Sequence, residues 1–203
     1  MERKEGTEGS MCLHAVLLQS VYNSLCNPYC DPFCNPAILQ SCNSAMEKIL
    51  ISACLLGERV RYHGGDARIE HPILGRWLEE GRLVPVCPEV AGGLTTPRPA
   101  AEIMASPEAR RVLTQGGDDV TSAFERGAAA AAAVCAANGI RVAILKDGSP
   151  SCGSRAISDG SFSGRRIGGQ GFTAARLAEH RIAIFSENEI QDAAAYVAAL
   201  EAT

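Results

Sequence analysis

Three cysteines follow three apolar segments of the chain, and their thiols are the side chains best suited to chemistry. The segments are 48–53 (KILISA), 82–86 (RLVPV) and 141–145 (RVAIL), and the cysteines are Cys54, Cys87 and Cys152. Around the last cysteine, the sequence GSPSCG favours a tight turn that points the thiol and nearby N–H groups outward. Because a thiolate is both a nucleophile and a soft metal ligand, the pattern indicates a redox or metal site.

The elements around these cysteines predict an α/β fold. Helical periodicity or composition is found in four segments, 71–81, 119–138, 172–180 and 188–200, and a further short strand is expected at 181–185. Strands that alternate with helices imply right-handed crossovers and a mostly parallel sheet flanked by helices, a Rossmann-like arrangement of three layers. Two segments rich in Gly and Pro or Ser, 90–103 and 158–171, are predicted to be irregular.

The three cysteines are expected to converge. In an open parallel sheet, ligands bind beyond the carboxyl ends of the strands, which is where each of these cysteines stands. The alternative is that each is a small buried apolar residue, as we expect for Cys135 inside the alanine-rich helix. Three thiolates without an obvious fourth ligand leave one coordination position open, which suits catalytic zinc or an iron–sulfur cluster. The spacing alone does not separate these two.

Composition narrows the class of protein. Of the 203 residues, 46% are hydrophobic and 21% are charged, and the net charge of −4 gives no bulk signal for nucleic acid. No apolar run reaches the roughly 18 residues of a membrane span. Nine cysteines, an odd number, argue against a simple disulfide framework and favour a reducing compartment, so a cytoplasmic protein is predicted.

The first part of the chain differs in character from the rest. Residues 1–45 are rich in Cys and Pro, and prolines interrupt any helix on which Cys26, Cys30 and Cys34 might share a face. We expect a poorly ordered extension there, with a small extra metal site as the alternative. The regular pattern begins at Met46, so residues 46–203 are predicted to form one α/β domain.

Three blocks of the sequence resemble the thiouracil desulfidase family. They are SACLLG with RYHGG, VPVCPEVAGGL with TPRPAAEI, and ILKDGSPSCGS with DGSFSG, and together they extend over about residues 46–190. The resemblance implies an iron–sulfur enzyme that removes sulfur from thiouracil or a related small thiolated nucleobase or nucleoside. It also implies a 4Fe-4S cluster on Cys54, Cys87 and Cys152, with one iron that no cysteine binds. Relatives commonly carry Asp where this chain has His63.

The resemblance also implies catalytic roles for Glu89 and for a serine of the SPSC turn, Ser149 or Ser151. Glu89 stands two residues after Cys87, where a carboxylate can activate water and move protons. Either serine can hold the nucleobase or the water. The net reaction is then a hydrolysis that releases hydrogen sulfide and needs no external electron donor.

Other residues are expected to bind the substrate. Arg98 lies between two prolines, which positions its guanidinium for a carbonyl or phosphate, and Gly64 and Gly65 allow close approach of the backbone to a ligand. The same three cysteines also allow two alternative functions. One is a non-catalytic iron–sulfur sensor or sulfur carrier, and the other is a zinc hydrolase. The sequence makes no prediction about oligomeric state.

Overall fold

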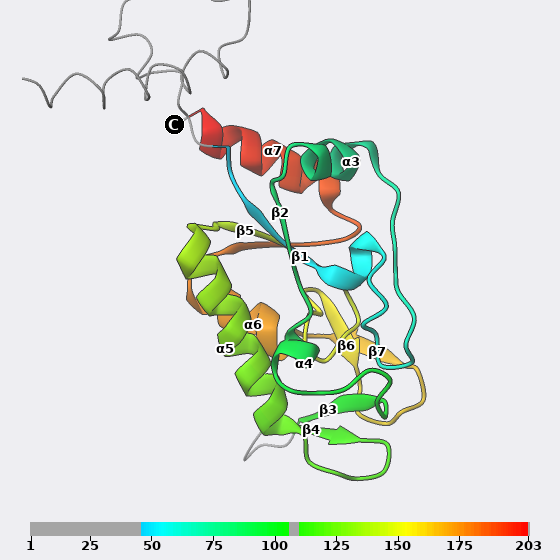
Figure 1. The fold of residues 1–203 in the computed structure, drawn as a ribbon. Coiled ribbons are helices and arrows are strands. Elements are labelled where there is room, and N and C mark those ends of the chain that lie inside the picture. The colour runs from blue at the N-terminus through cyan, green and yellow to red at the C-terminus, as the bar shows by residue number, and fades with distance from the viewer. Residues whose placement is uncertain (1–45, 106–109, 203) are drawn as a thin grey trace, which may run out of the picture. The chain divides into compact units, whose positions relative to one another are not determined.

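A computed structural model describes residues 46–105 and 110–202, which belong to one compact unit (Figure 1). The predictions for residues 1–45 lie outside the described residues. Four strands form a parallel sheet in the order β2–β1–β5–β8. Their bounds are Ile49–Ser52 for β1, Leu83–Val86 for β2, Val142–Leu145 for β5 and Ala183–Ser186 for β8. This confirms the predicted parallel α/β architecture.

The central strand β1 is buried on both faces. Ile49 and Ile51 pack in one hydrophobic cluster and Leu50 packs in the other, because successive side chains of a strand point to opposite faces. All four residues of β1 are buried, so its first three residues form a continuous apolar run rather than an alternating pattern, and Ser52 is the buried polar residue at its end.

Two pairs of helices cover the sheet. Figure 1 shows α3 with α7 at one side of the strands, and α5 with α6 at the other. The bounds are Pro72–Glu79 for α3, Thr121–Asn138 for α5, Phe172–Glu179 for α6 and Ile190–Glu201 for α7. Helix α3 buries Leu74 and Trp77, and the Nδ1 atom of His71 caps its first turn by accepting the N–H of Ile73 at 3.2 Å. Among the described helices, none has the length and apolar character needed to cross a membrane.

Two small antiparallel hairpins form partly within segments that were predicted to be loops. Strand β3 (Ala101–Ala105) pairs with β4 (Arg110–Thr114), and β6 (Ala156–Ser158) pairs with β7 (Arg166–Gly168). The prediction that 90–103 and 158–171 are irregular was therefore wrong for the parts that form the start of β3, the last residue of β6, and β7. Pairing with a partner strand outweighs the low strand preference of segments rich in glycine.

The short helix α4 (Pro88–Ala91) rests directly on α5 through two glycines. A Cβ atom on Gly127 would lie 2.1 Å from the carbonyl oxygen of Pro88, and one on Gly92 would lie 2.0 Å from that of Ala123. Both distances are far inside van der Waals contact, so only glycine permits this approach. The contact fixes α4, and with it the segment that carries Cys87 and Glu89.

We predict opposite effects for two Gly→Ala substitutions within helices. Gly127→Ala must push α4 away from α5 and is expected to lower the free energy of unfolding by about 1–3 kcal/mol. Gly75→Ala, in α3, meets no atom within 4 Å and is expected to raise the free energy of unfolding by about 0.5–1 kcal/mol. Urea denaturation of both variants measures the difference. An equally stable Gly127→Ala protein would show that α4 is free to move.

Candidate metal centre and active site

The three predicted cysteines line one cavity. Cys54 lies in the 3-10 helix η1 (Ala53–Leu56) after β1, Cys87 caps the start of α4 after β2, and Cys152 lies in the turn after β5. Since β2, β1 and β5 are parallel neighbours, their carboxyl ends meet at one edge of the sheet. All three residues border a cavity of about 440 Å³ at that edge.

Cys54 and Cys152 are buried and Cys87 is partly buried, and the thiols affect one another's pKa. Burial, with a further contribution from Cys87, raises the pKa of Cys54 to about 11. Burial likewise raises the pKa of Cys87, and burial raises the pKa of Cys152, with Cys54 and Cys87 adding to the effect. The protein alone therefore keeps these thiols protonated at neutral pH, and metal ligation must displace their protons.

The arrangement of the thiols fits a body larger than one ion. Within the described residues, no group of three or more His, Cys, Asp or Glu side chains is close enough to hold a single metal ion. Three thiolates around one zinc, each about 2.3 Å from it, would lie within about 4 Å of one another. A cluster of four irons and four sulfides places its ligands around a wider body, and cysteine thiolates are its usual ligands. The donor set and the shared cavity fit such a cluster.

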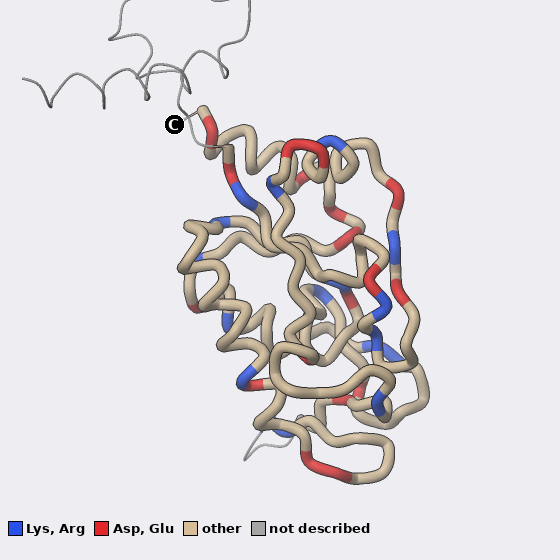
Figure 2. Tube along the Cα trace, in the orientation of Figure 1, with Lys and Arg blue, Asp and Glu red and all other residues tan. Residues whose placement is uncertain are grey.

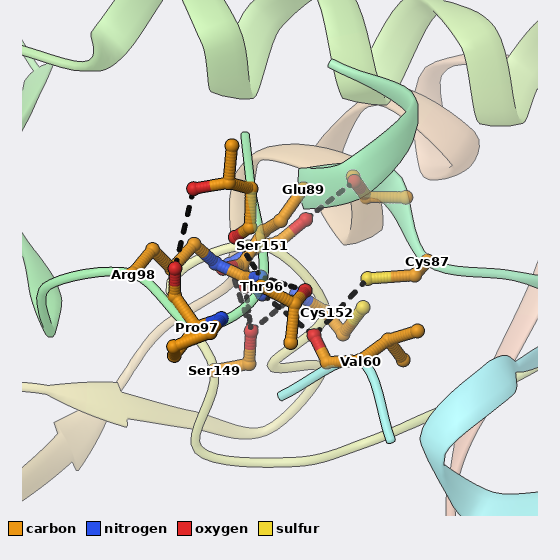
Figure 3. A network of polar contacts seen from close by, with 11 residues as sticks. Val60, Cys87, Glu89, Thr96, Pro97, Arg98, Ser149, Ser151 and Cys152 are labelled. Atoms are coloured by element: carbon orange, nitrogen blue, oxygen red, sulfur yellow. Dashed lines mark hydrogen bonds and ion pairs between the residues drawn. The ribbon is translucent and has the colours of Figure 1, made fainter. Parts of the chain in front are cut away.

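A buried ion pair between Arg98 and Glu89 lies beside the thiols (Figure 3). The Nε and Nη2 atoms of Arg98 lie 2.9 and 2.8 Å from Oε2 of Glu89, and the two side chains are 6% and 16% exposed. Arg98 also donates to the Thr95 carbonyl and the Thr96 hydroxyl, both at 3.0 Å, and to the Val60 carbonyl at 2.9 Å. All three nitrogen atoms of the guanidinium therefore donate to protein acceptors, and Nη2 makes a further ion-pair contact with Glu89.

The same network joins two of the cysteine segments. The Val60 carbonyl accepts from Arg98 and also from the thiol of Cys87 at 3.8 Å. At the other end of the network, the Ser149 hydroxyl donates to Oε1 of Glu89 at 3.4 Å and accepts the N–H of Cys152 at 3.2 Å. Glu89 is thus held between an arginine and the turn that carries Cys152.

Two side chains shape the turn that carries Cys152. Oδ1 of Asp147 accepts the N–H groups of three residues at 3.0–3.1 Å, namely Ser154, Arg155 and Ala156. Burial opposes ionisation, but these hydrogen bonds prevail and lower the pKa of Asp147. Ser151 faces away from the cavity, because it is 1% exposed and its hydroxyl lies 2.9 Å from that of Thr173. The structure therefore brings Ser149, but not Ser151, to the cavity.

Gly64 and Gly65 form a turn beside the cavity rather than part of its lining. Gly64 has a φ of +80°, which suits glycine, and its carbonyl accepts from Nε of Arg59 at 3.1 Å. Nδ1 of His63 accepts the N–H of Gly65 at 3.1 Å. An aspartate at this position can make the same contact with its carboxylate, so His63 preserves the turn.

Sequence reasoning missed several residues that line the cavity, among them Arg61, Tyr62, Glu102, Phe162 and Arg166. Arg61 and Tyr62 belong to the RYHGG block, Glu102 to the TPRPAAEI block and Phe162 to the DGSFSG block, so membership of these blocks was the available signal. Their approach to the cysteines depends on contacts between segments that are distant in the sequence.

The parallel sheet, with three thiols and Glu89 around one cavity at its carboxyl edge, defines an α/β protein with a candidate metal site. A family model, 2-thiouracil desulfurase, matches residues 49–189, and the chain belongs to this family. The resemblance found in the sequence is thereby confirmed.

Two similar proteins cover most of the chain. The solved structure of TudS, a 4Fe-4S-dependent thiouracil desulfidase, is 49% identical, with a TM-score of 0.71 over 75% of this chain and 98% of that one. The uncharacterized protein YbbK of Bacillus subtilis (strain 168) is 39% identical over 150 residues, which are 71% of this chain and 98% of that protein.

We predict strong energetic coupling between Glu89 and Arg98. In a double-mutant cycle with Glu89→Ala and Arg98→Ala, the coupling free energy from urea denaturation is expected to be about 1–3 kcal/mol, because each single change leaves a buried charge unpaired. The exposed pair Arg176–Glu179 on α6 is the matched control, for which about 0.3–0.5 kcal/mol is expected. Equal coupling in the two pairs would contradict a role for the buried pair in holding the site together.

Proposed function

We propose that this protein is a 4Fe-4S-dependent thiouracil desulfidase whose cluster is held by Cys54, Cys87 and Cys152, with one iron not bound by cysteine. The observation that carries the proposal is the convergence of these thiols on the cavity that Glu89 and Ser149 also line. Family membership and the 49% identical TudS structure support the iron–sulfur enzyme over zinc hydrolysis. When bound, the cluster supplies a thiophilic Lewis acid for the C=S sulfur.

Glu89 is proposed to orient water and accept its proton. Because Nε of Arg98 donates to Oε2 and Nη2 lies 2.8 Å from the same oxygen, the ion pair holds the carboxylate in place. Its Oε1 atom has the Ser149 hydroxyl as a long hydrogen-bond partner at 3.4 Å, a contact that a water molecule can replace. A fixed carboxylate at the cavity wall is the arrangement that general base catalysis requires.

Of the two serines of the SPSC turn, we propose Ser149 as the catalytic one. Its hydroxyl faces Glu89 and also accepts the N–H groups of Ser151 and Cys152 at 3.1 and 3.2 Å. These bonds orient the hydroxyl proton toward Glu89 or a bound substrate. Ser151 then supports the turn through Thr173.

Arg98 is proposed to position Glu89 rather than to bind substrate directly. Each of its three nitrogen atoms already donates to a protein acceptor, so substrate binding by the guanidinium would compete with these bonds. Gly64 and Gly65 are proposed to contribute indirectly, by shaping the turn that follows Arg61 and Tyr62, which line the cavity.

The proposed reaction is a hydrolysis. The oxygen of water forms the new C=O bond, the C=S bond breaks, and sulfur leaves as hydrogen sulfide, so no net electrons are transferred. The substrate is proposed to be a small thiolated nucleobase or nucleoside, since the cavity holds about 440 Å³. Segments of both charges alternate along the described chain (Figure 2), which favours a small substrate over a nucleic acid. We propose a cytoplasmic location from the cysteine usage.

Iron and acid-labile sulfide per chain test the cluster. After anaerobic purification, the full chain is expected to hold about four of each. Cys152→Ala should lose both together with turnover, while Cys135→Ala, at a buried cysteine of α5 that does not line the cavity, should keep them. Zinc without sulfide in the wild-type protein would contradict the proposed cofactor.

Turnover of thiouracil by Glu89→Gln tests the catalytic role of this carboxylate. We expect an unchanged iron content and a loss of about 10²–10⁴-fold in kcat, because the amide cannot accept the water proton. Release of hydrogen sulfide and uracil from 2-thiouracil is the measurement. Unchanged kcat would remove Glu89 from the mechanism, and no turnover by the wild-type protein would favour a sensor or sulfur carrier.

A further inference from the structure

A second carboxylate, Glu102 on β3, lines the same cavity and has no assigned role. Glu102 is 8% exposed, and its Oε2 atom accepts the N–H of Phe162 at 3.0 Å. Over residues 46–105 and 110–202, no cation pairs with this carboxylate and no hydrogen bond reaches its Oε1 atom. Among the described residues, the Ser154 hydroxyl oxygen is the one fully buried side-chain polar atom without a partner, so Oε1 of Glu102 is accessible from the cavity that Glu102 lines. Oε1 is therefore free to accept a hydrogen bond from a ligand in the cavity.

The loop of Phe162 is held tightly against β3 at this point. Phe162 adopts a left-handed conformation with a φ of +56°, which is uncommon for a residue other than glycine. Beside it, a Cβ atom on Gly160 would lie 3.0 Å from the Ile103 carbonyl oxygen, so the loop and the strand are in close contact. The hydrogen bond from Phe162 to Glu102 links the DGSFSG and TPRPAAEI blocks across the cavity wall.

This wall offers the two features that a pyrimidine ring needs. Phe162 lines the cavity with an aromatic side chain, on which a planar base can stack. Glu102 offers a hydrogen-bond acceptor, and 2-thiouracil carries two ring N–H donors, at N1 and N3. A lone carboxylate is a poor site for a cation, whereas a carboxylate beside an aromatic ring suits an uncharged heterocycle with N–H groups.

We propose that Glu102 accepts a hydrogen bond from a ring N–H of the thiolated pyrimidine and so selects substrates that carry that donor. This inference rests on the proposed desulfidase function and adds the group that recognises the base. Phe162, anchored by the other carboxylate oxygen, packs against the ring. Glu102 binds the substrate, while Glu89 acts at the reacting carbon.

The substitution Glu102→Gln replaces the free acceptor oxygen with an N–H donor and keeps the hydrogen bond from Phe162. The N–H of Phe162 still requires an acceptor, so the amide oxygen must take the position of Oε2. The amide nitrogen then presents a donor to the cavity in place of an acceptor. The variant thus keeps the Phe162 loop in place, but its amide N–H faces the ring N–H of the substrate, and two donors cannot form a hydrogen bond.

The experiment compares 2-thiouracil with its 1-methyl and 3-methyl derivatives, each of which lacks one ring N–H. For one of the two derivatives, kcat/KM of the wild-type enzyme is expected to be about tenfold to a hundredfold lower than for 2-thiouracil. The position of the methyl group in that derivative identifies the ring nitrogen that the enzyme recognises. Glu102→Gln should lower kcat/KM for 2-thiouracil by a similar factor and abolish the preference over that derivative. Glu79→Gln, on the exposed part of α3, should retain the wild-type pattern.

Calorimetric binding of uracil and its two methyl derivatives to the iron-loaded proteins gives a readout independent of turnover. The same preference in Kd for wild-type protein, and its loss in Glu102→Gln, supports the proposal. Equal affinity of the wild-type protein for all three compounds overturns it, even if the variant does not fold. If uracil binds with this preference but thiouracil is not turned over, the desulfidase function fails and the recognition site stands.

Discussion

The ion pair between Arg98 and Glu89 is the interaction on which the site depends. A buried guanidinium gains little net stability from one partner, but here each of its nitrogen atoms donates to an acceptor, and the acceptors lie in three separate segments of the chain. It fixes the carboxylate of Glu89 and, through the Val60 carbonyl, touches the segment of Cys87. Because these contacts lie entirely within the protein, the geometry of the site does not rely on substrate to assemble it.

Much of the fold is visible in the sequence because its sheet is buried on both faces. Strands such as β1 and β5 are short, uninterrupted apolar runs, and the helices between them carry periodicity and end signals at glycines. None of the four hairpin strands was predicted from the sequence, and β3 and β7 lie in segments whose composition favours loops. What makes them strands is pairing with β4 and β6, a property of the partners rather than of the segments themselves.

The sequence predicted the site only for residues whose type suggests chemistry and whose position directly follows a strand. Each of the three cysteines follows a strand, so the parallel sheet alone is enough to bring them to one edge. The unpaired oxygen of Glu102 and the three N–H groups gathered by Asp147 could not be anticipated, because each depends on the exact path of a loop. The prediction that Arg98 binds substrate stays a prediction, and the sequence did not show that Glu89 would pair with its guanidinium.

The order of the strands along the chain also sets the order in which the three cysteine segments can come together during synthesis. Strand β1 lies at the centre and pairs with β2, so the segments of Cys54 and Cys87 can become neighbours while later residues are still being synthesised. Cys152 comes only after β5, which must then insert on the other side of β1. The third thiol of the candidate site can therefore join the first two only after β5 and the turn that follows it have been synthesised.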